Sequence, residues 1–344
     1  MNKWILVLLL AGSFMACKNK QPDISAYKAH VVIERFDKDF FALDTLQLDQ
    51  SLDKLLKKYP AFLPDYLVKV LGINPADSLA KPAIRAFIRT YKPVNVEAGT
   101  MADKALPNVA TDISQALRYM QYYFPAFKPD SPFAVTTFIG PMDAFEAFST
   151  GDYGDVRTRN GVGIALQLHL GGNAPLYDMG KQEGLFYDYQ TRRFTPEMMV
   201  VNSVKNLLDD AFPYTAAGKP LIEEMIEKGK RINALDYLLP TLADTLKIGY
   251  TGRQLKGCEA NEAVIWDYFV KNDLLYSKDG TINQVYLKDG PKTPELGDQS
   301  PGYLGLFVGR QIVRAFAKKH SKVSLQDIMK MDALTLFNQA GYKP

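Results

Sequence analysis

Apolar residues recur at helical spacing along most of the chain. In residues 46–59, for example, leucines occupy positions 48, 52, 55 and 56. Side chains three or four positions apart share one face of a helix, so each such stripe predicts an amphipathic helix. Stripes of this kind cover residues 46–59, 79–91, 111–124, 196–212, 219–239, 253–272, 303–320 and 325–339. The protein is therefore predicted to be mainly helical.

Four shorter segments have the features of strands. Residues 132–140 are rich in β-branched and aromatic side chains, and residues 30–36 have a similar character. Apolar side chains alternate with small or polar ones over residues 162–170, which predicts a half-buried strand. Residues 282–287 lie between two Asp-Gly pairs, which are typical of turns around a short strand. We expect an α+β fold, mainly helical, with a small, mostly antiparallel sheet.

The N-terminus has the features of an export signal. Lys3 precedes an apolar run over residues 4–14, which is shorter than the roughly 20 residues that span a bilayer. Ala16 and Cys17 follow, an arrangement that resembles the lipobox of bacterial lipoproteins, with Phe14 where leucine is usual. Cleavage after Ala16 would leave Cys17 as a lipidated N-terminus. The alternative is a plain secretory signal that a cysteine follows by chance.

The sequence suggests three consecutive parts. Residues 1–16 form the signal peptide, residues 17–29 a lipidated tether, and residues 30–344 the globular body. A candidate subdivision of the body lies near residues 125–131, between a helical part and the central strands. No later segment has 18 consecutive apolar residues, so the sequence predicts no second membrane-embedded segment.

Composition narrows the classes of function. The 344 residues are 47% hydrophobic and 23% charged, with a net charge of +3. This mixture is typical of a globular protein and excludes low-complexity disorder. The weak positive charge does not indicate nucleic-acid binding. Two cysteines and three histidines are too few for a disulfide framework or a cysteine-based zinc site.

Familiar catalytic motifs do not occur in the sequence. Val31, Leu170 and Ser321 follow the three histidines, so there is no HExxH motif. Neither the GxSxG motif of hydrolases nor a phosphate-binding loop of the GxxxxGK type is present. We therefore assign no catalytic residue, no metal ligand and no cofactor. An enzyme built from scattered carboxylates remains compatible with these absences.

One predicted helix carries three acids close together. Glu223, Glu224 and Glu227 follow Pro220, and they could together bind a cation or act as acid and base. Acids in the first turn of a helix interact favourably with its dipole, and a four-residue spacing to basic residues stabilises a helix surface. We therefore favour a solvated face for these three acids.

Glu262 is the main candidate for a buried functional or structural acid. It shares one helical sector with Cys258, Ile265, Trp266 and Phe269. A carboxylate in such a stripe is either desolvated or paired with a buried partner. We expect Trp266 and Phe269 to be buried, and Glu262 to be mostly buried and paired. A structural ion pair is favoured over a catalytic role.

His169 is a second single-residue candidate. The alternation over residues 162–170 places it opposite the leucines, on the same strand face as Gln167. A histidine at this place could line a cleft. We favour a hydrogen-bonded or exposed side chain without a catalytic role.

The segment 303–320 shows features of packing. Gly305 and Gly309 lie on its apolar face, and two small residues four positions apart allow another backbone to approach closely. Arg310, Arg314 and Lys318 fall on the opposite side of the helix. This basic line could meet anionic lipid or an acidic partner. A solvated helix face is the favoured interpretation.

Several segments of the second half carry a resemblance to a known family. They are residues 236–240 (DYLLP), 247–254 (KIGYTGRQ), 261–277 (NEAVIWDYFVKNDLLYS) and 300–314 (SPGYLGLFVGRQIVR), together with the Cys17 lipobox and the final Tyr342-Lys343-Pro344. These segments resemble the gliding-motility lipoprotein GldB family of Bacteroidota. The resemblance implies a lipid-anchored envelope protein that contacts the membrane and proteins of the gliding or linked secretion machinery. It supplies no catalytic residues.

A weaker similarity is to zincin-type metallopeptidases, in which a strand precedes an HExxH helix and a later glutamate completes the zinc site. The corresponding helix here, near residues 200–209, has no histidine, so a zincin-like fold would be degenerate and without its metal site. The leading hypothesis is an envelope protein that acts by protein–protein interaction or scaffolding. The alternative is a hydrolase or degenerate metallopeptidase-like protein that uses buried carboxylates such as Glu262. Because residues 18–20 lack an acidic run, we expect the protein to face the periplasm.

Overall fold

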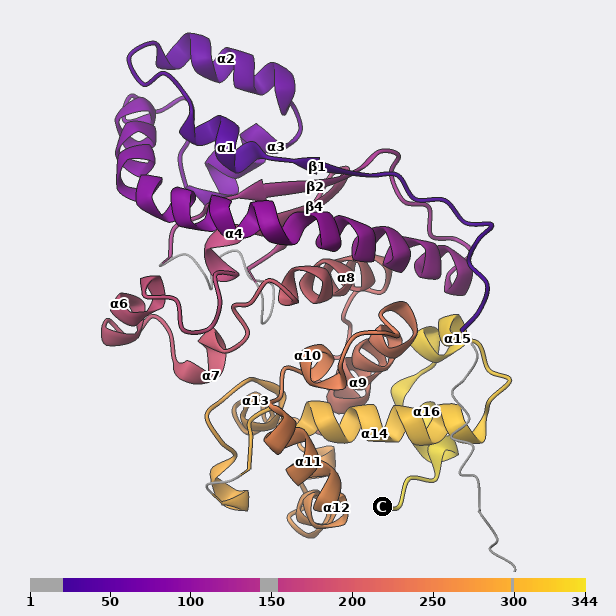
Figure 1. Cartoon of the computed structure of the whole chain (residues 1–344). Helices are drawn as coiled ribbons and strands as arrows, with labels where there is room; N and C mark the ends of the chain where they lie inside the picture. Colours follow the sequence, from indigo (N-terminus) through magenta and orange to yellow (C-terminus); the bar gives the residue numbers. More distant parts are fainter. Residues whose placement is uncertain (1–20, 143–153, 298–299) are drawn as a thin grey trace, which may run out of the picture.

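The computed structural model describes residues 21–142, 154–297 and 300–344 (Figure 1). The predicted signal peptide and Cys17 lie outside the described residues. The elements of the first half are β1 (Val31–Glu34), α1 (Phe36–Phe41), α2 (Leu48–Lys58), α3 (Phe62–Asp65), the π-helical turn η1 (Tyr66–Val70), α4 (Ala80–Tyr123), β2 (Phe133–Phe138), β3 (Val156–Thr158), β4 (Gly161–Ala165) and the 3₁₀ turn η2 (Leu166–Leu168).

The second half of the chain is helical throughout its described elements. These are α6 (Leu176–Gln182), α7 (Asp188–Thr191), α8 (Met198–Ala211), α9 (Leu221–Leu238), α10 (Asp244–Ile248), α11 (Gly252–Ala260), α12 (Glu262–Lys271), η3 (Leu274–Tyr276), α13 (Gly280–Leu287), η4 (Pro294–Leu296), α14 (Leu304–Lys319), α15 (Leu325–Lys330) and α16 (Ala333–Ala340). The predicted mainly helical α+β character is confirmed.

The sheet has the strand order β1-β2-β4-β3 and is mixed. β1 and β2 are parallel, β2 and β4 are parallel, and β3 and β4 form an antiparallel hairpin. The prediction of a mostly antiparallel sheet is therefore wrong. Helices α1 to α4 connect β1 to β2, and a long crossover of this kind joins parallel strands. β2 and β4 are also buried on both faces, so their sequence pattern did not reveal their direction.

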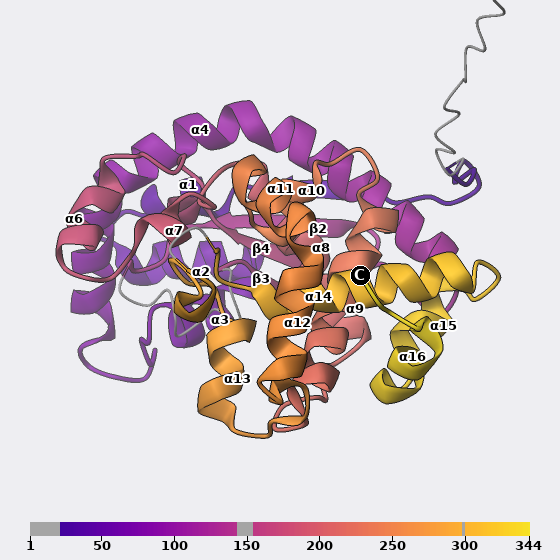
Figure 2. The ribbon, with the colours of Figure 1, turned by 90° about the horizontal axis from the view of Figure 1, so that it is seen from below.

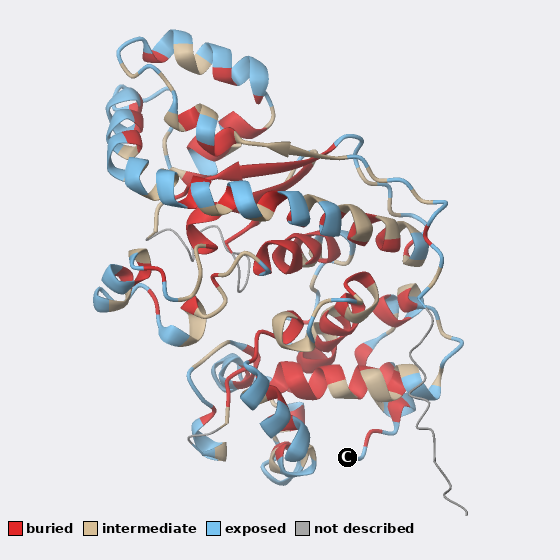
Figure 3. Ribbon diagram, in the orientation of Figure 1, coloured by how far each residue is buried: buried red, intermediate tan, exposed pale blue. Residues whose placement is uncertain are grey.

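Helices cover both faces of the sheet (Figures 1 and 2). On one face, α4 and α8 pack on strand residues that include Val135 and Val162. On the other face, aromatic residues gather around Phe138; Phe36 comes from α1, and Tyr66 follows α3. Burial is most continuous in the central strands and in α8, α9 and α14 (Figure 3). The core therefore extends from the sheet into the C-terminal helices.

Helix α4 is a single helix of 44 residues, although the sequence pattern predicted separate helices over 79–91 and 111–124. Pro93 and Pro107 lie inside it. Proline cannot donate a backbone hydrogen bond, so it normally interrupts a helix. Both prolines are exposed here, which allows water to reach the carbonyl groups that have lost their partner. The apolar stripe on the buried side continues past both positions.

Helices α9 and α14 cross at Gly229 and Gly309, and Gly305 of α14 faces α13. A Cβ atom added to Gly309 would lie 1.8 Å from the carbonyl oxygen of Met225, and one added to Gly229 would lie 2.2 Å from the carbonyl carbon of Gly309. A Cβ atom on Gly305 would lie 2.9 Å from the carbonyl oxygen of Tyr286. The predicted close backbone approach at Gly305 and Gly309 is therefore confirmed.

Two predicted elements near the sheet and the C-terminal helices have a different structure. The strand expected over 162–170 ends at Ala165, where a 3₁₀ turn begins, and it is buried on both faces. Residues 282–287 belong to α13 and not to a strand. The Asp279 carboxylate accepts hydrogen bonds from the N–H groups of Thr281 and Ile282, so the Asp-Gly pair caps a helix.

Two predicted helices are each divided in two. The segment 253–272 forms α11 and α12, which meet at Asn261. The segment 325–339 forms α15 and α16, and Asp332 caps α16 by accepting from the N–H group of Thr335. In both cases a side-chain amide or carboxylate lies where the chain turns. Within the described residues, no helix combines the length and the apolar character needed to cross a membrane.

Candidate functional site

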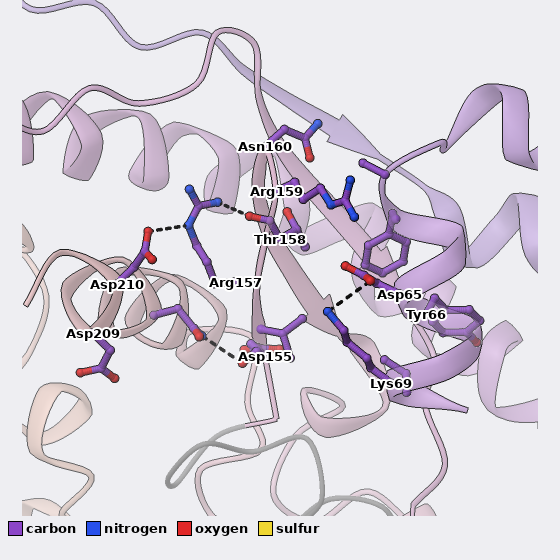
Figure 4. Close-up of a pocket in the computed structure, with 15 residues that line it drawn as sticks. Asp65, Tyr66, Lys69, Asp155, Arg157, Thr158, Arg159, Asn160, Asp209 and Asp210 are labelled. Carbon is purple, nitrogen blue, oxygen red and sulfur yellow. Dashed lines mark hydrogen bonds and ion pairs between the residues drawn. The ribbon is translucent and has the colours of Figure 1, made fainter. Parts of the chain in front are cut away.

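A cleft of about 530 Å³ lies beside β3, the edge strand of the sheet (Figure 4). One wall is formed by α3 and the π-helical turn that follows it, and the other by the C-terminal turns of α8. Hairpin residues 155–160 lie between these walls. No described strand pairs with the outer edge of β3, so that edge borders the cleft.

Charged side chains lie on both walls of the cleft. Lys69 Nζ is 3.2 Å from Asp65 Oδ1 on the wall formed by residues 61–70. Arg157 Nε, on β3, is 3.2 Å from Asp210 Oδ2 on α8 (Figure 4). Both pairs are partly exposed, so each contributes little to stability. The two pairs place opposite charges on both sides of the cleft.

The hairpin at the cleft is held by its own arginine. The Arg157 guanidinium donates hydrogen bonds to the carbonyl oxygens of Thr158 and Gly161, which flank the turn. Arg159, at the tip of that turn, is exposed and forms no ion pair with any described residue. The hairpin therefore presents a cationic tip on a fixed backbone.

A buried polar cluster centred on Asp155 lies behind the cleft. Its Oδ1 accepts a hydrogen bond from the Ala165 N–H group at 2.8 Å, and its Oδ2 accepts one from Asn202 Nδ2 at 2.9 Å. Its backbone carbonyl accepts from Asn206 Nδ2 at 2.9 Å. His169 Nε2 lies 2.9 Å from Oδ2. The cluster therefore joins the hairpin to α8 and to the turn after β4.

Both ring nitrogens of His169 are engaged in buried contacts. Nδ1 lies 3.0 Å from the carbonyl oxygen of Thr195, which can only accept. Nε2 faces the Asp155 carboxyl group, whose two oxygens also accept hydrogen bonds from Ala165 and Asn202. Burial lowers the pKa of His169, but the Asp155 charge and hydrogen bond outweigh burial and raise the pKa above its usual 6.5. Because both nitrogens face buried partners and His169 does not line the cleft, its ring does not offer a general base there.

A second polar cluster joins α9, α10 and α14. Arg310 Nη2 lies 2.7 Å from Asp236 Oδ1 and 2.8 Å from Asp244 Oδ2. Arg314 Nη2 lies 2.9 Å from a carboxylate oxygen of each of the same two residues. Lys247 Nζ is 3.3 Å from Asp236 Oδ1. We call these five residues the ion network; it pairs three cations with two carboxylates, and its Arg310 and Lys247 are buried.

The ion network corrects the expectation of a solvated basic line on α14. Arg310 is buried, because α9 and α10 cover the side of α14 that the sequence pattern left polar. Arg314 is partly exposed, and Lys318 is exposed. Burial opposes ionisation of Asp244, but the charges of Arg310 and Arg314 outweigh it and lower the pKa of that carboxyl group.

The comparison with family models decides the relationship of this chain. The model described as gliding motility protein GldB matches residues 17–344. The chain belongs to the GldB family. This is a lipoprotein family associated with gliding motility, and the match begins at Cys17. Comparisons with curated proteins and with solved structures find no match.

In this GldB-family chain, three of the four internal segments that carry the resemblance meet at the ion network. Asp236 begins segment 236–240, Lys247 begins segment 247–254, and Arg310 lies near the end of segment 300–314. These charged residues hold three helices together. Charge pairing therefore brings these three separate stretches of sequence together in the fold.

Glu262 of the GldB-family chain accepts hydrogen bonds from two neutral donors. Gln311 Nε2 donates to Oε2 and the Tyr342 hydroxyl donates to Oε1, each at 2.7 Å. Phe269 is buried, whereas Glu262 and Trp266 are only half-buried, unlike the prediction. Helix α12 lies at the margin of the helical part, with α14 on its inner side, so solvent reaches its flank (Figure 1). Glu262 does not line any described cleft.

The three acids of α9 are less exposed than the sequence predicted. Glu223 and Glu224 are buried and Glu227 is half-buried, so the prediction of a solvated face is wrong. Glu224 accepts hydrogen bonds from the Tyr214 hydroxyl at 2.9 Å and from Asn283 Nδ2 at 3.2 Å. Helix α9 contacts α8, α13, α14 and α16, so little of its surface reaches solvent.

The remaining candidate groups do not form a reactive centre within the described residues. Cys258 is buried, and burial raises the pKa of its thiol to about 12, so the thiolate nucleophile is scarce at neutral pH. The described part of the chain contains no group of three or more His, Cys, Asp or Glu side chains placed to hold a metal ion. Cys17, the predicted lipid-attachment site, lies outside the described residues.

Sequence analysis missed three residues of the buried cluster. Asn202 and Asn206 lie four positions apart on α8, which is otherwise largely apolar and buried. Two amides on one buried helix face require buried partners, so their spacing could have revealed the cluster. Asp155 lies in a stretch of sequence without periodicity, so no sequence pattern predicts its role. His169 was expected to be hydrogen-bonded or exposed, and it is buried and hydrogen-bonded.

Proposed function

We propose that this GldB-family protein is anchored by lipid at Cys17 and acts in gliding motility by binding other envelope proteins. The family match that begins at Cys17, directly after an apolar run and Ala16, supports the anchor. Two or more acyl chains attach a protein stably to a membrane. The short basic stretch 18–20 favours a position on the periplasmic side.

The cleft beside β3 is the proposed binding site for an envelope protein of the gliding or linked secretion machinery. The observation that carries this proposal is the state of His169, whose two ring nitrogens are both engaged in buried hydrogen bonds. The imidazole of His169, the group best suited to acid–base catalysis, therefore has a structural role. Arg159 and the Asp65–Lys69 pair remain at the surface of the cleft, where they can recognise charged groups.

The rival proposal is a hydrolase that uses buried carboxylates such as Glu262. Glu262 is held by Gln311 and Tyr342 and lies away from the described clefts, which favours a structural role for this residue. A degenerate metallopeptidase-like scaffold is a related proposal. It is supported by Asn202 and Asn206, which have the four-residue spacing of two metal-binding histidines and donate to Asp155 instead.

The anchor is tested by the substitution Cys17→Ser in cells grown with a radioactive fatty acid. We expect the label to disappear from the protein, the unprocessed form to accumulate and gliding to be lost. A serine substitution at Cys258, which is buried in the body, is the control and should keep the label. Persistent labelling of the Cys17→Ser protein would refute the anchor.

The cleft is tested by placing a photo-crosslinking amino acid at Arg159 in the full-length protein. Lys256 on α11 is exposed and lies away from the cleft, so the same amino acid there is the control. We expect envelope proteins of the gliding machinery to be captured from position 159 and not from position 256. Equal capture from both positions, or none from position 159, contradicts binding at the cleft. Gliding that survives Arg159→Glu would contradict it as well.

A further inference from the structure

We propose that one face of the protein, centred on the docked segment 21–29, rests on the lipid headgroups of the membrane that holds Cys17. This inference depends on the proposed lipid anchor and adds the orientation of the body. The proposed face binds an anionic bilayer. The face lies at the C-terminal end of α4, beside α15 and the end of α14 (Figure 1).

The segment that leads from the anchor to the body is fixed to α4. Arg118 Nη2 donates to the carbonyl oxygen of Ile24 at 2.9 Å, and its Nε donates to that of Tyr27 at 3.1 Å. Gln121 Nε2 donates to the carbonyl oxygen of Lys28 at 2.8 Å. The Ile24 side chain is buried in the main core. Residues 21–29 are therefore part of the folded body.

This docking leaves very little chain between body and lipid. Residues 18–20 alone separate Cys17 from Gln21. An extended chain spans at most about 3.6 Å per residue, so Gln21 lies within roughly 15 Å of the lipidated cysteine. A body with diameter several times this reach cannot rotate freely above the bilayer. The surface around Gln21 must turn toward the headgroups.

That surface is a groove with an aromatic wall. Two adjoining cavities of about 1470 and 680 Å³ share Pro22, Tyr123 and Tyr237. Tyr122 is 40% exposed, and its ring meets that of Tyr123 edge to face, with centroids 4.9 Å apart. Tyrosine side chains combine an apolar ring with a polar hydroxyl, and for that reason they are enriched where protein meets the membrane interface.

The charges on this groove match an anionic lipid surface. Arg314, Lys318 and Lys322 line the two cavities, and Lys318 and Lys322 are exposed. Asp236 lines the larger cavity, and its charge is neutralised within the ion network. Asp23 lies nearby on the docked segment and is exposed. Basic side chains close to anionic headgroups are attracted to them over about one Debye length.

The orientation is tested with single thiols that carry a spin label, introduced one at a time in a protein that also carries Cys258→Ser. Tyr122→Cys and Lys322→Cys lie on the proposed face, and Lys57→Cys lies on α2, at the far end of the body (Figures 1 and 2). The full-length lipidated proteins are reconstituted into vesicles of phosphatidylethanolamine and phosphatidylglycerol. We expect a water-soluble nickel relaxation agent to reach the labels at 122 and 322 at least threefold less than the label at 57.

The possible outcomes distinguish the proposed lipid anchor from the proposed orientation of the body. Failure of the wild-type protein to sediment with the vesicles would refute the anchor itself. Sedimentation with equal nickel access at all three positions would refute only the orientation. Purified vesicles hold no other protein, so protection there must come from lipid. If the labels at 122 and 322 are protected from nickel only in native envelopes, this face binds a protein partner and the inference is wrong.

The contribution of charge is tested by two matched double variants. Lys318→Glu with Lys322→Glu reverses two charges on the face, and Lys54→Glu with Lys57→Glu reverses two exposed charges on α2. In the first variant we expect the label at 122 to lose at least half of its protection, because anionic headgroups then repel the face. The second variant should keep full protection. Equal behaviour of both variants contradicts recognition of headgroup charge.

Discussion

His169 Nε2 lies 2.9 Å from Asp155 Oδ2, and this pair is buried between the hairpin and α8. Both side chains are almost completely excluded from solvent. A buried pair of this kind is stable only when the remaining polar atoms are satisfied, and Thr195, Ala165 and Asn202 supply those partners. The pair therefore makes the wall of the cleft sensitive to protonation.

The stability contributed by His169 should fall as the pH rises above 6.5. The folded-state pKa of His169 lies above its ordinary 6.5, so the stabilisation is complete below pH 6.5 and disappears as the pH rises through the folded-state value. His169→Gln should lower the free energy of unfolding by roughly 3–5 kcal/mol below pH 6.5, because Asp155 loses its counter-charge. The difference in the free energy of unfolding between His169→Gln and the wild-type protein should shrink toward alkaline pH. Urea unfolding of both proteins across a pH series measures this.

His30 provides the control for that experiment, because it is exposed and outside the cluster. His30→Gln should unfold in parallel with the wild-type protein at every pH. A deficit for His169→Gln that is constant from pH 6 to pH 9 would show that His169 is neutral in the folded protein. The raised pKa of His169 would then be wrong.

The glycine crossing of α9 and α14 should not tolerate a methyl group. In Gly309→Ala the new Cβ would lie 1.8 Å from the Met225 carbonyl oxygen, which belongs to backbone and cannot rotate away. The helices must separate, and overpacking of this kind costs about 1–3 kcal/mol or more. Thermal unfolding should show the loss directly.

Gly257→Ala is the matched control, because Gly257 lies on the exposed side of α11 with no atom near its added Cβ. Alanine is the better helix former by about 1 kcal/mol, so this variant should be neutral or slightly more stable. If Gly309→Ala also proves neutral, the two helices are farther apart than the structure places them.

Periodicity in the sequence predicted the elements that bury one face. The stripe over 303–320 predicted α14. It also predicted the close contact at Gly309, because two glycines on the apolar side of a helix allow another backbone to approach. The same periodicity wrongly predicted that Arg310 is exposed to solvent. A helix surrounded by neighbours also buries polar positions, and whether a partner carboxylate exists depends on α9 and α10, which are distant in sequence.

The candidate site was harder to predict from the sequence than the fold. β3 has only three residues, so no period could mark it as the edge strand beside a cleft. Asp155 gains its role from the amides of Asn202 and Asn206, about fifty positions later in the chain. The parallel pairing of β1 with β2 likewise depends on a connection through α4. These features arise from tertiary contacts, which local patterns do not encode.

Removal of Arg310 should destabilise the C-terminal helices more than removal of Arg314. Arg310 is 1% exposed, and its loss leaves Asp236 and Asp244 short of a buried partner, which costs roughly 3–5 kcal/mol. Arg314 is 37% exposed, and water can replace part of its interaction. Arg310→Met and Arg314→Met keep the aliphatic stem and isolate the charge. Urea midpoints that are equal for the two variants would contradict a buried role for Arg310.

Glu262 should act as a fastening point for the C-terminus. Its carboxylate receives one hydrogen bond from Gln311 and one from Tyr342, and Tyr342 also meets the Trp266 ring edge to face at 5.1 Å. Glu262→Ala removes both acceptors and should cost roughly 1–3 kcal/mol, since hydrogen bonds to a charged group are the stronger ones. Glu262→Gln keeps the shape and one acceptor, so its loss should be smaller.

Tyr342→Phe completes the series, because it removes one of the two hydrogen bonds and keeps the ring. Its loss of stability should lie between those of the wild-type protein and Glu262→Ala. Hydrogen exchange should locate the effect: amides of α16 should exchange faster in Glu262→Ala, while those of the distant sheet stay protected. Normal stability of Glu262→Ala together with loss of gliding would instead assign this carboxylate to binding or catalysis. That outcome would favour the hydrolase alternative over a structural role.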